Sequence, residues 1–294
     1  MIAILGGLAA ALLWAMSNVA SARSSRIIGP TSTVAWMLLI GLVVSTPFAA
    51  VSGPLPSITP TLAVWLTVSG IGGVIGLTLV YRGLRIGKVG VVLALTSTEG
   101  AIAAMLSMVA GERLNVLTVL VLGVIAIGVA TVALSGGTTV EPAETGDGAR
   151  PPSGPGADRR AALYGVAAAI AFGFSVYGTA RIGMALPVAI AVLPVRIAGV
   201  AFVFVPAALA SRLQMTRRAA PLVVIVGLGE VLGNAAFVIG SRQSIAVASV
   251  LASQFAALAA VVAFVLFRER LSTRQRSGFV AIALGVAALT LVRG

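Results

Sequence analysis

The chain has 294 residues, of which 59% are hydrophobic and 10% charged, with a net charge of +12 and a mean hydropathy of +1.10. Soluble domains are nearer 45–50% apolar and about 25% charged, so this composition excludes a water-soluble globule. Cysteine and histidine are absent, which excludes disulfides, thiolate or imidazole metal sites and His-dependent catalytic triads. We therefore expect an integral membrane protein that is not an enzyme and has no metal, cofactor or catalytic residue.

Ten apolar stretches are long enough to cross a bilayer, which needs roughly 20 residues at 1.5 Å each. Because every backbone amide must be satisfied internally in lipid, these stretches are expected to be helices. No basic residue precedes Arg23, so the first stretch is interpreted as a retained span and not as a signal peptide. The expected spans are residues 2–21, 33–51, 62–81, 89–110, 115–135, 161–180, 188–210, 220–240, 246–267 and 275–292.

Residues 136–160 differ in composition from the rest of the chain. They are rich in proline and glycine with mixed charge, which predicts a flexible linker. The linker divides the chain into a five-helix unit over residues 1–135 and a second over residues 161–294.

The two units resemble each other in sequence. A shift of 157 residues aligns them without a gap from the third helix of each to the fifth. Because each unit has an odd number of spans, the second must enter the membrane from the opposite side. The prediction is an all-α polytopic membrane protein with ten transmembrane helices arranged as two inverted five-helix repeats, which is typical of secondary transporters. The shift places Gly72 on Gly229, Gly76 on Gly233, Gly83 on Gly240, Arg85 on Arg242 and Glu112 on Glu269.

In each unit one turn follows the fourth helix and leads into a glycine-rich helix. The turn is GERLN at residues 111–115 in the first unit and RERLS at 268–272 in the second. With these turns the chain resembles the EamA-type branch of the drug/metabolite transporter superfamily. The resemblance implies a ten-helix carrier of amino acids, metabolites or drugs. We interpret Glu112 and Glu269 as capping or pairing groups at an interface, because the motif carries no ligand chemistry.

Three ionisable residues lie well inside expected spans: Glu99, Arg196 and Glu230. Each costs at least about 2.5–3.5 kcal/mol at mid-membrane, so a purpose is expected for them. Glu99 is expected at the centre of the fourth span. Either the two glutamates bind substrate or a coupling proton, or Arg196 pairs with one of them as a buried structural ion pair.

Further candidates for substrate or proton binding are polar and aromatic residues on the same helix faces. Two matching stripes, in the first and sixth helices, are expected to line a hydrated cavity. The alternative is that the hydroxyl groups bond back to their own helices and that the tryptophan only packs. The candidates are Asn234 beside Glu230, Thr96 beside Glu99, Gln254 in the ninth helix, Trp14, Ser17, Asn18 and Ser21 in the first helix, and Phe172, Ser175 and Thr179 in the sixth.

The expected function is secondary active transport of a small metabolite, amino acid or drug-like solute across the plasma membrane by alternating access. We expect export, with protons as a candidate coupling ion. Two carboxylates and one guanidinium suit a cationic or zwitterionic solute, or a proton. The alternative is a passive channel or facilitator for a small polar solute, although a channel favours a continuous polar face or charged rings. No GxxxxGK[ST] phosphate loop occurs, so transport is not driven by ATP hydrolysis in this chain.

The expected partners are a small-molecule substrate and the lipid bilayer, with no nucleic acid, and the protein is a monomer or homodimer. The basic residues lie in short gaps between apolar runs, as expected for loops that orient a membrane protein. Most of the 20 are in the loops 23–32, 82–88, 136–160, 211–219 and 268–276. The positive-inside rule then places both termini outside the cytoplasm, whereas the family resemblance implies both termini inside.

Overall fold

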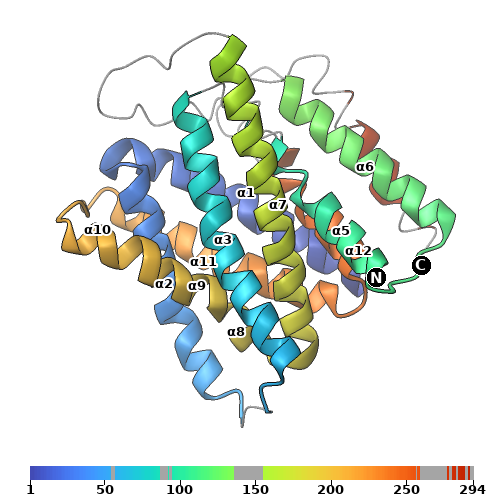
Figure 1. The fold of residues 1–294 in the computed structure, drawn as a ribbon, viewed down its shortest axis with the longest axis horizontal. Helices are drawn as coiled ribbons and strands as arrows, with labels where there is room; N and C mark the ends of the chain where they lie inside the picture. The colour runs from blue at the N-terminus through green and yellow to red at the C-terminus, as the bar shows by residue number, and fades with distance from the viewer. Residues whose placement is uncertain are drawn as a thin grey trace.

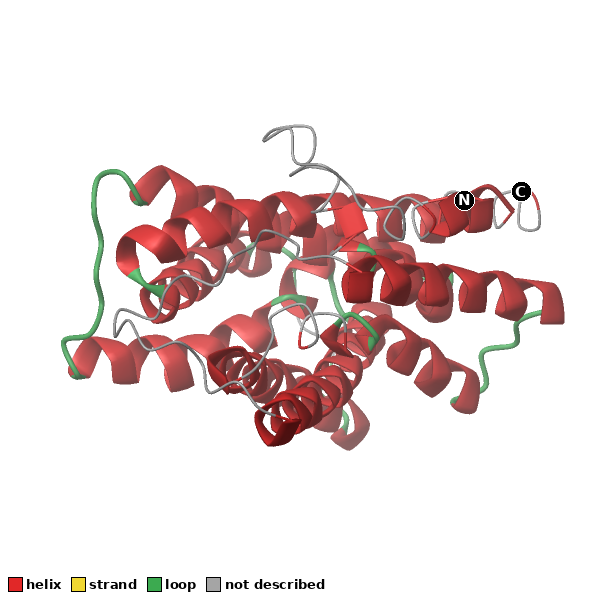
Figure 2. Ribbon diagram, turned by 90° about the horizontal axis from the view of Figure 1, so that it is seen from above, coloured by secondary structure: helices red, strands yellow, loops and turns green. Residues whose placement is uncertain are grey.

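A computed structural model describes residues 1–53, 57–86, 92, 95–135, 155–255 and 257–258, with a few residues between 277 and 291. These described parts contain helices and no strand (Figure 2). Six helices among them are long and apolar enough to cross a membrane. Large apolar side chains such as Leu5, Phe48 and Ile127 remain exposed on the outside of the bundle, as expected for a protein surrounded by lipid.

Most predicted spans of the first unit are observed as single helices. They are α1 (Ile2–Ile28), α2 (Pro30–Ala50), α3 (Pro60–Ile86) and α6 (Val116–Ser135). Gly29 separates α1 from α2 with a φ of 79°, a left-handed conformation that glycine adopts without steric cost. Pro30 then starts α2, where its missing N–H has no helical partner to lose.

In the second unit, α7 (Pro155–Ala185) and α11 (Ala220–Ser241) are long, uninterrupted helices. Helix α7 begins at Pro155, so the last residues of the expected 136–160 linker are helical. Residues 136–154, Glu269 and parts of the tenth expected span lie outside the described residues.

Three predicted spans are interrupted and not continuous. Helix α5 (Glu99–Val109) begins directly after a turn at residues 97–98, and α12 (Ile245–Ala252) ends at a turn at residues 253–254. The seventh span consists of α8 (Val188–Ala191), α9 (Leu193–Gly199), the π-helical segment η1 (Val200–Phe204) and α10 (Val205–Leu209). A proline near the start of α9 and of α10 lacks the N–H that a continuous helix needs.

The two units interlock through equivalent pairs of helices. The most extensive packing is between α3 and α7, which run side by side in Figure 1, and between α1 and α11. Each of these pairs joins the first helix of one unit to the third helix of the other. Helices α5 and α12 also pack together, as do α2 and α9. If the two units are exchanged, the α1–α11 contact therefore becomes the α3–α7 contact, and the α5–α12 and α2–α9 contacts each map onto themselves.

Glycines allow the closest of these approaches. A Cβ atom on Gly6 of α1 would lie 2.6 Å from the carbonyl oxygen of Ala236 and from the Cα atom of Gly240, both in α11. Backbone atoms cannot yield as side chains do, so only a small residue fits this crossing.

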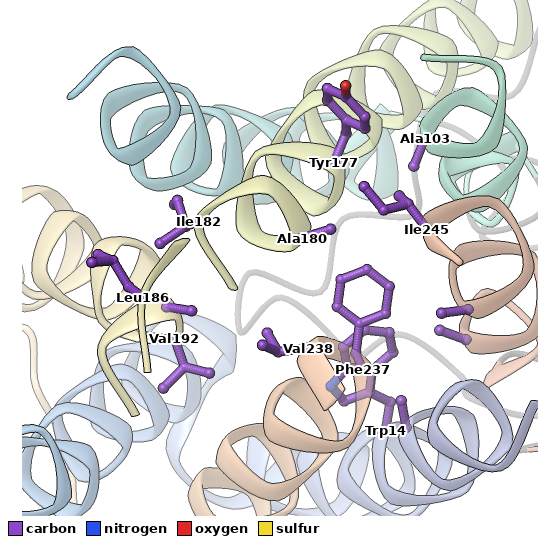
Figure 3. Packing of buried hydrophobic residues seen from close by; sticks show 14 of the residues in the cluster. Trp14, Ala103, Tyr177, Ala180, Ile182, Leu186, Val192, Phe237, Val238 and Ile245 are labelled. Atoms are coloured by element: carbon purple, nitrogen blue, oxygen red, sulfur yellow. The ribbon is translucent and has the colours of Figure 1, made fainter. Parts of the chain in front are cut away.

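The main hydrophobic core lies between the units and contains residues of both (Figure 3). Trp14 of α1 and Phe237 of α11 have ring centroids 6.2 Å apart, and Phe255, after α12, packs edge-on against Trp14 at the same distance. Tyr177 of α7 packs edge-on against Trp65 of α3. Aromatic residues from both units thus meet in the interior of the protein.

Hydrogen bonds between loops define two ends of the bundle. At one end, Ser32 contacts the backbone of Arg212 and Gln214, which joins the start of α2 to the loop before α11. At the other end, the side chain of Gln243 accepts a hydrogen bond from the Ala3 N–H. The N-terminus therefore lies at the end opposite the Arg212 loop.

The Glu112 carboxylate also lies at the N-terminal end of the bundle. It accepts hydrogen bonds from the Ser244 hydroxyl group and the Ala246 N–H, and so caps the start of α12. This geometry agrees with the interpretation of Glu112 as a capping group at an interface.

Candidate functional site

The three ionisable residues predicted inside the membrane spans lie on three different helices. Glu99 is the first residue of α5, Arg196 lies in α9 and Glu230 lies in α11. Glu99 is 8% exposed and Arg196 is 4% exposed, while Glu230 is half-buried. Glu230 interacts electrostatically with both Arg196 and Glu99. The charge of Glu230 thus acts on both Arg196 and Glu99, and we call these three residues the acidic cluster.

The position of Glu99 corrects one expectation. The sequence predicted Glu99 at the centre of a continuous fourth helix, but the chain turns at residues 97–98 and Glu99 starts a new helix. A negative side chain in the first turn of a helix is favoured by the helix dipole. The turn places Glu99 at the start of a helix, where the helix dipole stabilises its carboxylate. A position in the middle of a helix would not have this stabilisation.

Glu230 has local partners on two helices. The Ser17 hydroxyl group of α1 lies 3.5 Å from Oε1 of Glu230 and also donates to the carbonyl oxygen of Val226 at 3.1 Å. The Asn234 amide donates to the carbonyl oxygen of Glu230 at 2.7 Å. Asn234 thus shares a face with Glu230 as predicted, but its N–H group is bonded to the backbone of its own helix.

Arg196 of α9 packs against α2, a helix that contacts both α9 and α11. A Cβ atom on Gly41 of α2 would lie 3.3 Å from both Cγ and Nε of Arg196 and 3.5 Å from the Val231 side chain. Glycine at position 41 therefore leaves room for the guanidinium group to lie alongside α2 toward α11. Among the described residues Arg196 has no ion pair within hydrogen-bonding distance, so its interaction with Glu230 acts over a longer range.

The carboxylate of Glu99 has no hydrogen-bond partner among the described residues. Its surroundings are tight. A Cβ atom on Gly100, the next residue, would collide with the carbonyl oxygen of Ser249 and lie 2.6 Å from the Ser253 side chain. The start of α5 is therefore pressed against the end of α12, so the interruptions of the fourth and ninth spans meet in space.

Two other polar side chains of this region are also unpartnered. Nε1 of Trp14 and Nε2 of Gln254 are buried and have no hydrogen-bond acceptor in the described structure. Trp14 is 9% exposed and Gln254 is 1% exposed. Buried donors are nearly always bonded, so these two are exceptions among the described residues, as are Ser45, Trp65, Thr118 and Ser249. Asn18 is half-buried and forms no hydrogen bond to a described residue.

The serines of the two polar stripes make equivalent contacts in the two units. Ser17 donates to the carbonyl oxygen of Val226, and Ser175 donates to that of Ser69, at 2.7 Å. Val226 and Ser69 are equivalent under the 157-residue shift. The hydroxyl group of Ser175 therefore links α7 to α3, and its part in lining a hydrated cavity stays a prediction.

The aromatic residues of the stripes are also equivalent. A Cβ atom on Gly233 would lie 2.6 Å from Trp14, and one on Gly76 would lie 2.8 Å from Phe172. Gly233 and Gly76 are equivalent under the same shift. Phe172 is thus a packing residue.

Two threonines among the candidates bond to their own helices. Thr96 donates to the carbonyl oxygen of Val92, and Thr179 to that of Ser175. Thr96 follows the back-bonding alternative, whereas the Thr179 hydroxyl group also bonds the Ser69 hydroxyl group of α3 at 2.7 Å.

The acidic cluster departs from this symmetry. The shift pairs Glu230 with Gly73 and Glu99 with Ala256, so neither carboxylate has an acidic counterpart in the other unit. The helices of the two units therefore pack in an equivalent way, whereas their acidic residues do not occupy equivalent positions. Phe237 and Phe255, which surround Trp14, were missed from the sequence because neither belongs to a polar motif.

Comparisons with known proteins agree with this architecture. Residues 1–134 match the model of the EamA-like transporter family. No curated protein matches the chain. A solved structure titled "Crystal structure of protein" is similar over 99% of this chain and 96% of its own, with 19% sequence identity and a TM-score of 0.78. At this identity the likeness shows a shared fold over nearly the whole chain.

Proposed function

We propose that the whole chain is a secondary active transporter working by alternating access, as the match of residues 1–134 to the model of the EamA-like transporter family suggests. The observation that carries this proposal is the acidic cluster of Glu99, Arg196 and Glu230, assembled in the interior from spans of both units. Ionisable residues inside a membrane protein are costly and line transport pathways far more often than they serve packing alone.

The proposed architecture is a ten-span inverted repeat. It is supported by the exchange of contacts between the units, α1 with α11 and α3 with α7, and by the equivalent contacts of Ser17 and Ser175. Secondary transporters built from inverted repeats hold their substrate near the midplane, between the repeats and beside interrupted helices. The acidic cluster, with residues of both units, and the interruptions after α12 and before α5 support the proposal of such a site.

Alternating access would open the seam between the units at one end at a time. At the N-terminal end this seam is closed by the Glu112 cap on α12 and by Gln243 bonded to Ala3. At the other end it is closed by Ser32 bonded to the loop around Arg212. These few loop contacts are small enough to break and reform during a transport cycle.

We propose that the solute is exported across the plasma membrane by this multi-pass protein. Arg23 and Arg26 near the end of α1, and Arg217 and Arg218 in the segment before α11, lie at the end where Ser32 meets Arg212. The positive-inside rule would make this end cytoplasmic and place the N-terminus outside. A reporter fused to the N-terminus tests this orientation, since an active cytoplasmic reporter there would overturn it.

We propose proton coupling through the acidic cluster. A carboxylate that reaches both sides in turn can take up a proton from one and release it to the other. Glu99→Gln and Glu230→Gln remove one titrating group each and leave the side-chain shape nearly unchanged. In proteoliposomes loaded with a pH-sensitive dye, we expect at least one variant to lose solute-driven proton movement. If both variants transport with unchanged pH dependence, the coupling proposal is wrong.

Saturation and counterflow distinguish a carrier from a facilitator. A panel of amino acids, amines and drug-like cations is added to one side of the vesicle membrane, and exchange of preloaded solute is measured. A carrier shows saturable flux and accelerated exchange. Flux that stays linear with concentration and shows no exchange would overturn alternating access.

A further inference from the structure

Two pairs of helices, each with one member from each unit, are packed backbone to backbone. In the α1–α11 pair, a Cβ atom on Gly6 would lie 2.6 Å from the carbonyl oxygen of Ala236. In the α3–α7 pair, a Cβ atom on Gly72 would lie 3.0 Å from the carbonyl oxygen of Ala171. Interiors packed this closely transmit displacement as rigid units, so each pair is expected to move as one body.

Hydrogen bonds inside each pair add to this packing. The buried serines Ser17 and Ser175 each donate to a backbone carbonyl group of the other helix of their pair. The Gln243 side chain, after α11, accepts a hydrogen bond from the Ala3 N–H of α1 at 2.9 Å. The bond between Gln243 and Ala3 therefore joins the two units, yet it lies within the α1–α11 pair.

The contact between the two pairs is less extensive and lies mainly where α7 meets α11. At this contact, a Cβ atom on Gly183 of α7 would collide with the Val238 side chain of α11. Arg242 directly follows α11. Its guanidinium group donates from Nε to the carbonyl oxygen of Gly183 at 2.8 Å and from Nη2 to that of Leu186 at 3.1 Å. Arg242 therefore joins the α1–α11 pair to the α3–α7 pair.

The end of α7 is suited to receive a cation. In a longer helix the carbonyl group of Gly183 would accept from residue 187, but this residue is Pro187 and has no N–H. The last carbonyl groups of a helix also carry partial negative charge, which favours a positive side chain beside them. Arg242 supplies both the missing donor and the charge, from a flexible side chain that can release the helix end without a change in backbone packing.

The acidic cluster is divided between the same two bodies. Glu230 lies in α11. Glu99 lies in α5, which packs on α7, and Arg196 lies in α9, which packs on α3. A movement of one pair against the other therefore changes the separation of Glu230 from the other two charged residues.

We propose that the bodies that move against each other in transport are the α1–α11 pair and the α3–α7 pair, and that Arg242 is the latch that closes them at the N-terminal end. This inference rests on the proposed transport function, because alternating access requires such a movement. It refines the seam between the units in one respect. The bond between Gln243 and Ala3 stays closed during the cycle, while the two bonds of Arg242 break when the pairs separate.

Distances between spin labels distinguish the pairs from the units, and their measurement needs no ligand. The chain has no cysteine, so labels on introduced cysteines report only the chosen positions. Leu5 and Val64 belong to one unit but to different pairs, whereas Val64 and Met184 belong to different units but to one pair. The label positions are exposed side chains near the N-terminal end, one on each helix: Leu5 on α1, Val64 on α3, Met184 on α7 and Ile239 on α11.

Double electron–electron resonance is recorded on the full chain in nanodiscs, with Arg242 and with Arg242→Ala. The variant loses two hydrogen bonds from a charged donor, so the ratio of the open to the closed population should rise about tenfold or more. We expect the distance between Leu5 and Val64 to gain a longer component. The distances within the α1–α11 pair and within the α3–α7 pair should keep their distributions.

The matched control is Gln243→Ala at the next position, which removes the acceptor of the Ala3 N–H inside the α1–α11 pair and should change no distance. Arg242→Lys keeps a positive charge at the end of α7 and should restore part of the closed population. Circular dichroism and gel filtration establish that each variant is folded. The proposal is wrong if Arg242→Ala lengthens a distance within a pair, or if it changes none of the distances.

Disulfides test the same assignment by preventing the movement. Gly183→Cys with Val238→Cys joins the two pairs within one unit, at positions whose Cβ atoms lie 3.5 Å apart. Gly83→Cys with Tyr164→Cys joins the two units within the α3–α7 pair, at positions whose Cβ atoms lie 3.1 Å apart. Both separations are near the about 3.5–4.5 Å that a disulfide needs.

The readout of the disulfides is exchange in vesicles, with radiolabelled phenylalanine, phenethylamine and tetraphenylphosphonium as probes. We expect oxidation to abolish exchange in the variant with cysteines at positions 183 and 238, and reduction to restore it. Oxidation should leave exchange unchanged in the variant with cysteines at positions 83 and 164. The opposite result would show that the two units are the moving bodies.

The spin-label measurement separates the two proposals because it does not require transport. Pairs that separate in Arg242→Ala, in a protein without saturable exchange, would support the moving bodies and overturn the carrier. Saturable exchange together with movement between the units inside a pair would support the carrier and overturn the assignment of the bodies.

Discussion

Two equivalent glycines allow a test of whether function depends on Trp14 or only on helix packing. Gly233 faces Trp14 and Gly76 faces Phe172. A Cβ atom on Gly233 would lie 2.6 Å from Cδ1 and Nε1 of Trp14, and one on Gly76 would lie 2.8 Å from Cδ1 of Phe172. Because relaxed carbon contacts are about 3.5–4.0 Å, alanine at either position displaces an aromatic ring by about 1 Å.

The two substitutions should cost similar stability and differ in function. Overpacking of this size destabilises by about 1–3 kcal/mol, so Gly233→Ala and Gly76→Ala should lower the melting temperature in detergent to a similar extent. Only Gly233→Ala moves Trp14, a candidate residue for substrate binding. A displacement of about 1 Å at a site can cost up to about 100-fold, so we expect substrate binding and solute exchange to fall about tenfold or more in Gly233→Ala alone.

Gly123→Ala in α6 is the matched control, since no atom lies within 4 Å of a Cβ atom there. Alanine is favoured over glycine in a helix by about 0.8–1 kcal/mol, so this variant should be at least as stable as the parent. The reasoning would be refuted if Gly76→Ala impaired binding as much as Gly233→Ala, or if Gly233→Ala changed neither stability nor binding.

Further predictions concern the cap and the charged cluster. Glu112→Ala removes the acceptor of the Ser244 hydroxyl group and the Ala246 N–H and should cost about 1.5–3 kcal/mol in thermal or denaturant unfolding. The exposed neighbour substitution Arg113→Ala should cost little, and equal effects would contradict the cap. Arg196→Met removes the positive charge that acts on Glu230 and should lower the melting temperature, whereas adding Glu230→Met should restore part of the loss. A double variant no more stable than Arg196→Met would show that the two charges do not stabilise each other.

Composition and the spacing of apolar runs were sufficient to predict a helical membrane protein, because lipid allows few alternatives to a helix. The limits of α2, α6 and α11 differ from the predicted spans by a few residues. Interruptions were harder to predict. The chain turns at residues 97–98 and 253–254 in sequences without proline, where packing of Gly100 against Ser249 decides the backbone path.

Only part of the candidate site could be predicted from the sequence. Glu99, Arg196 and Glu230 could be singled out because charges are rare in apolar sequence. Their convergence could not, because each lies on a different helix. Ser175 and Ser17 looked alike in sequence, yet Ser175 only bonds a backbone carbonyl while Ser17 also approaches Glu230.

The sequence by itself determined that this chain lies in a membrane, where its helices run and which few side chains are too polar for that environment, because each of these properties depends on residues close together along the chain. Only the tertiary structure decided that α1 pairs with α11 and α3 with α7, and that the buried donors of Trp14 and Gln254 are left without acceptors among the described residues. Such properties depend on distances between helices far apart in the chain, and these distances are set by the close packing of glycine faces that local sequence does not encode.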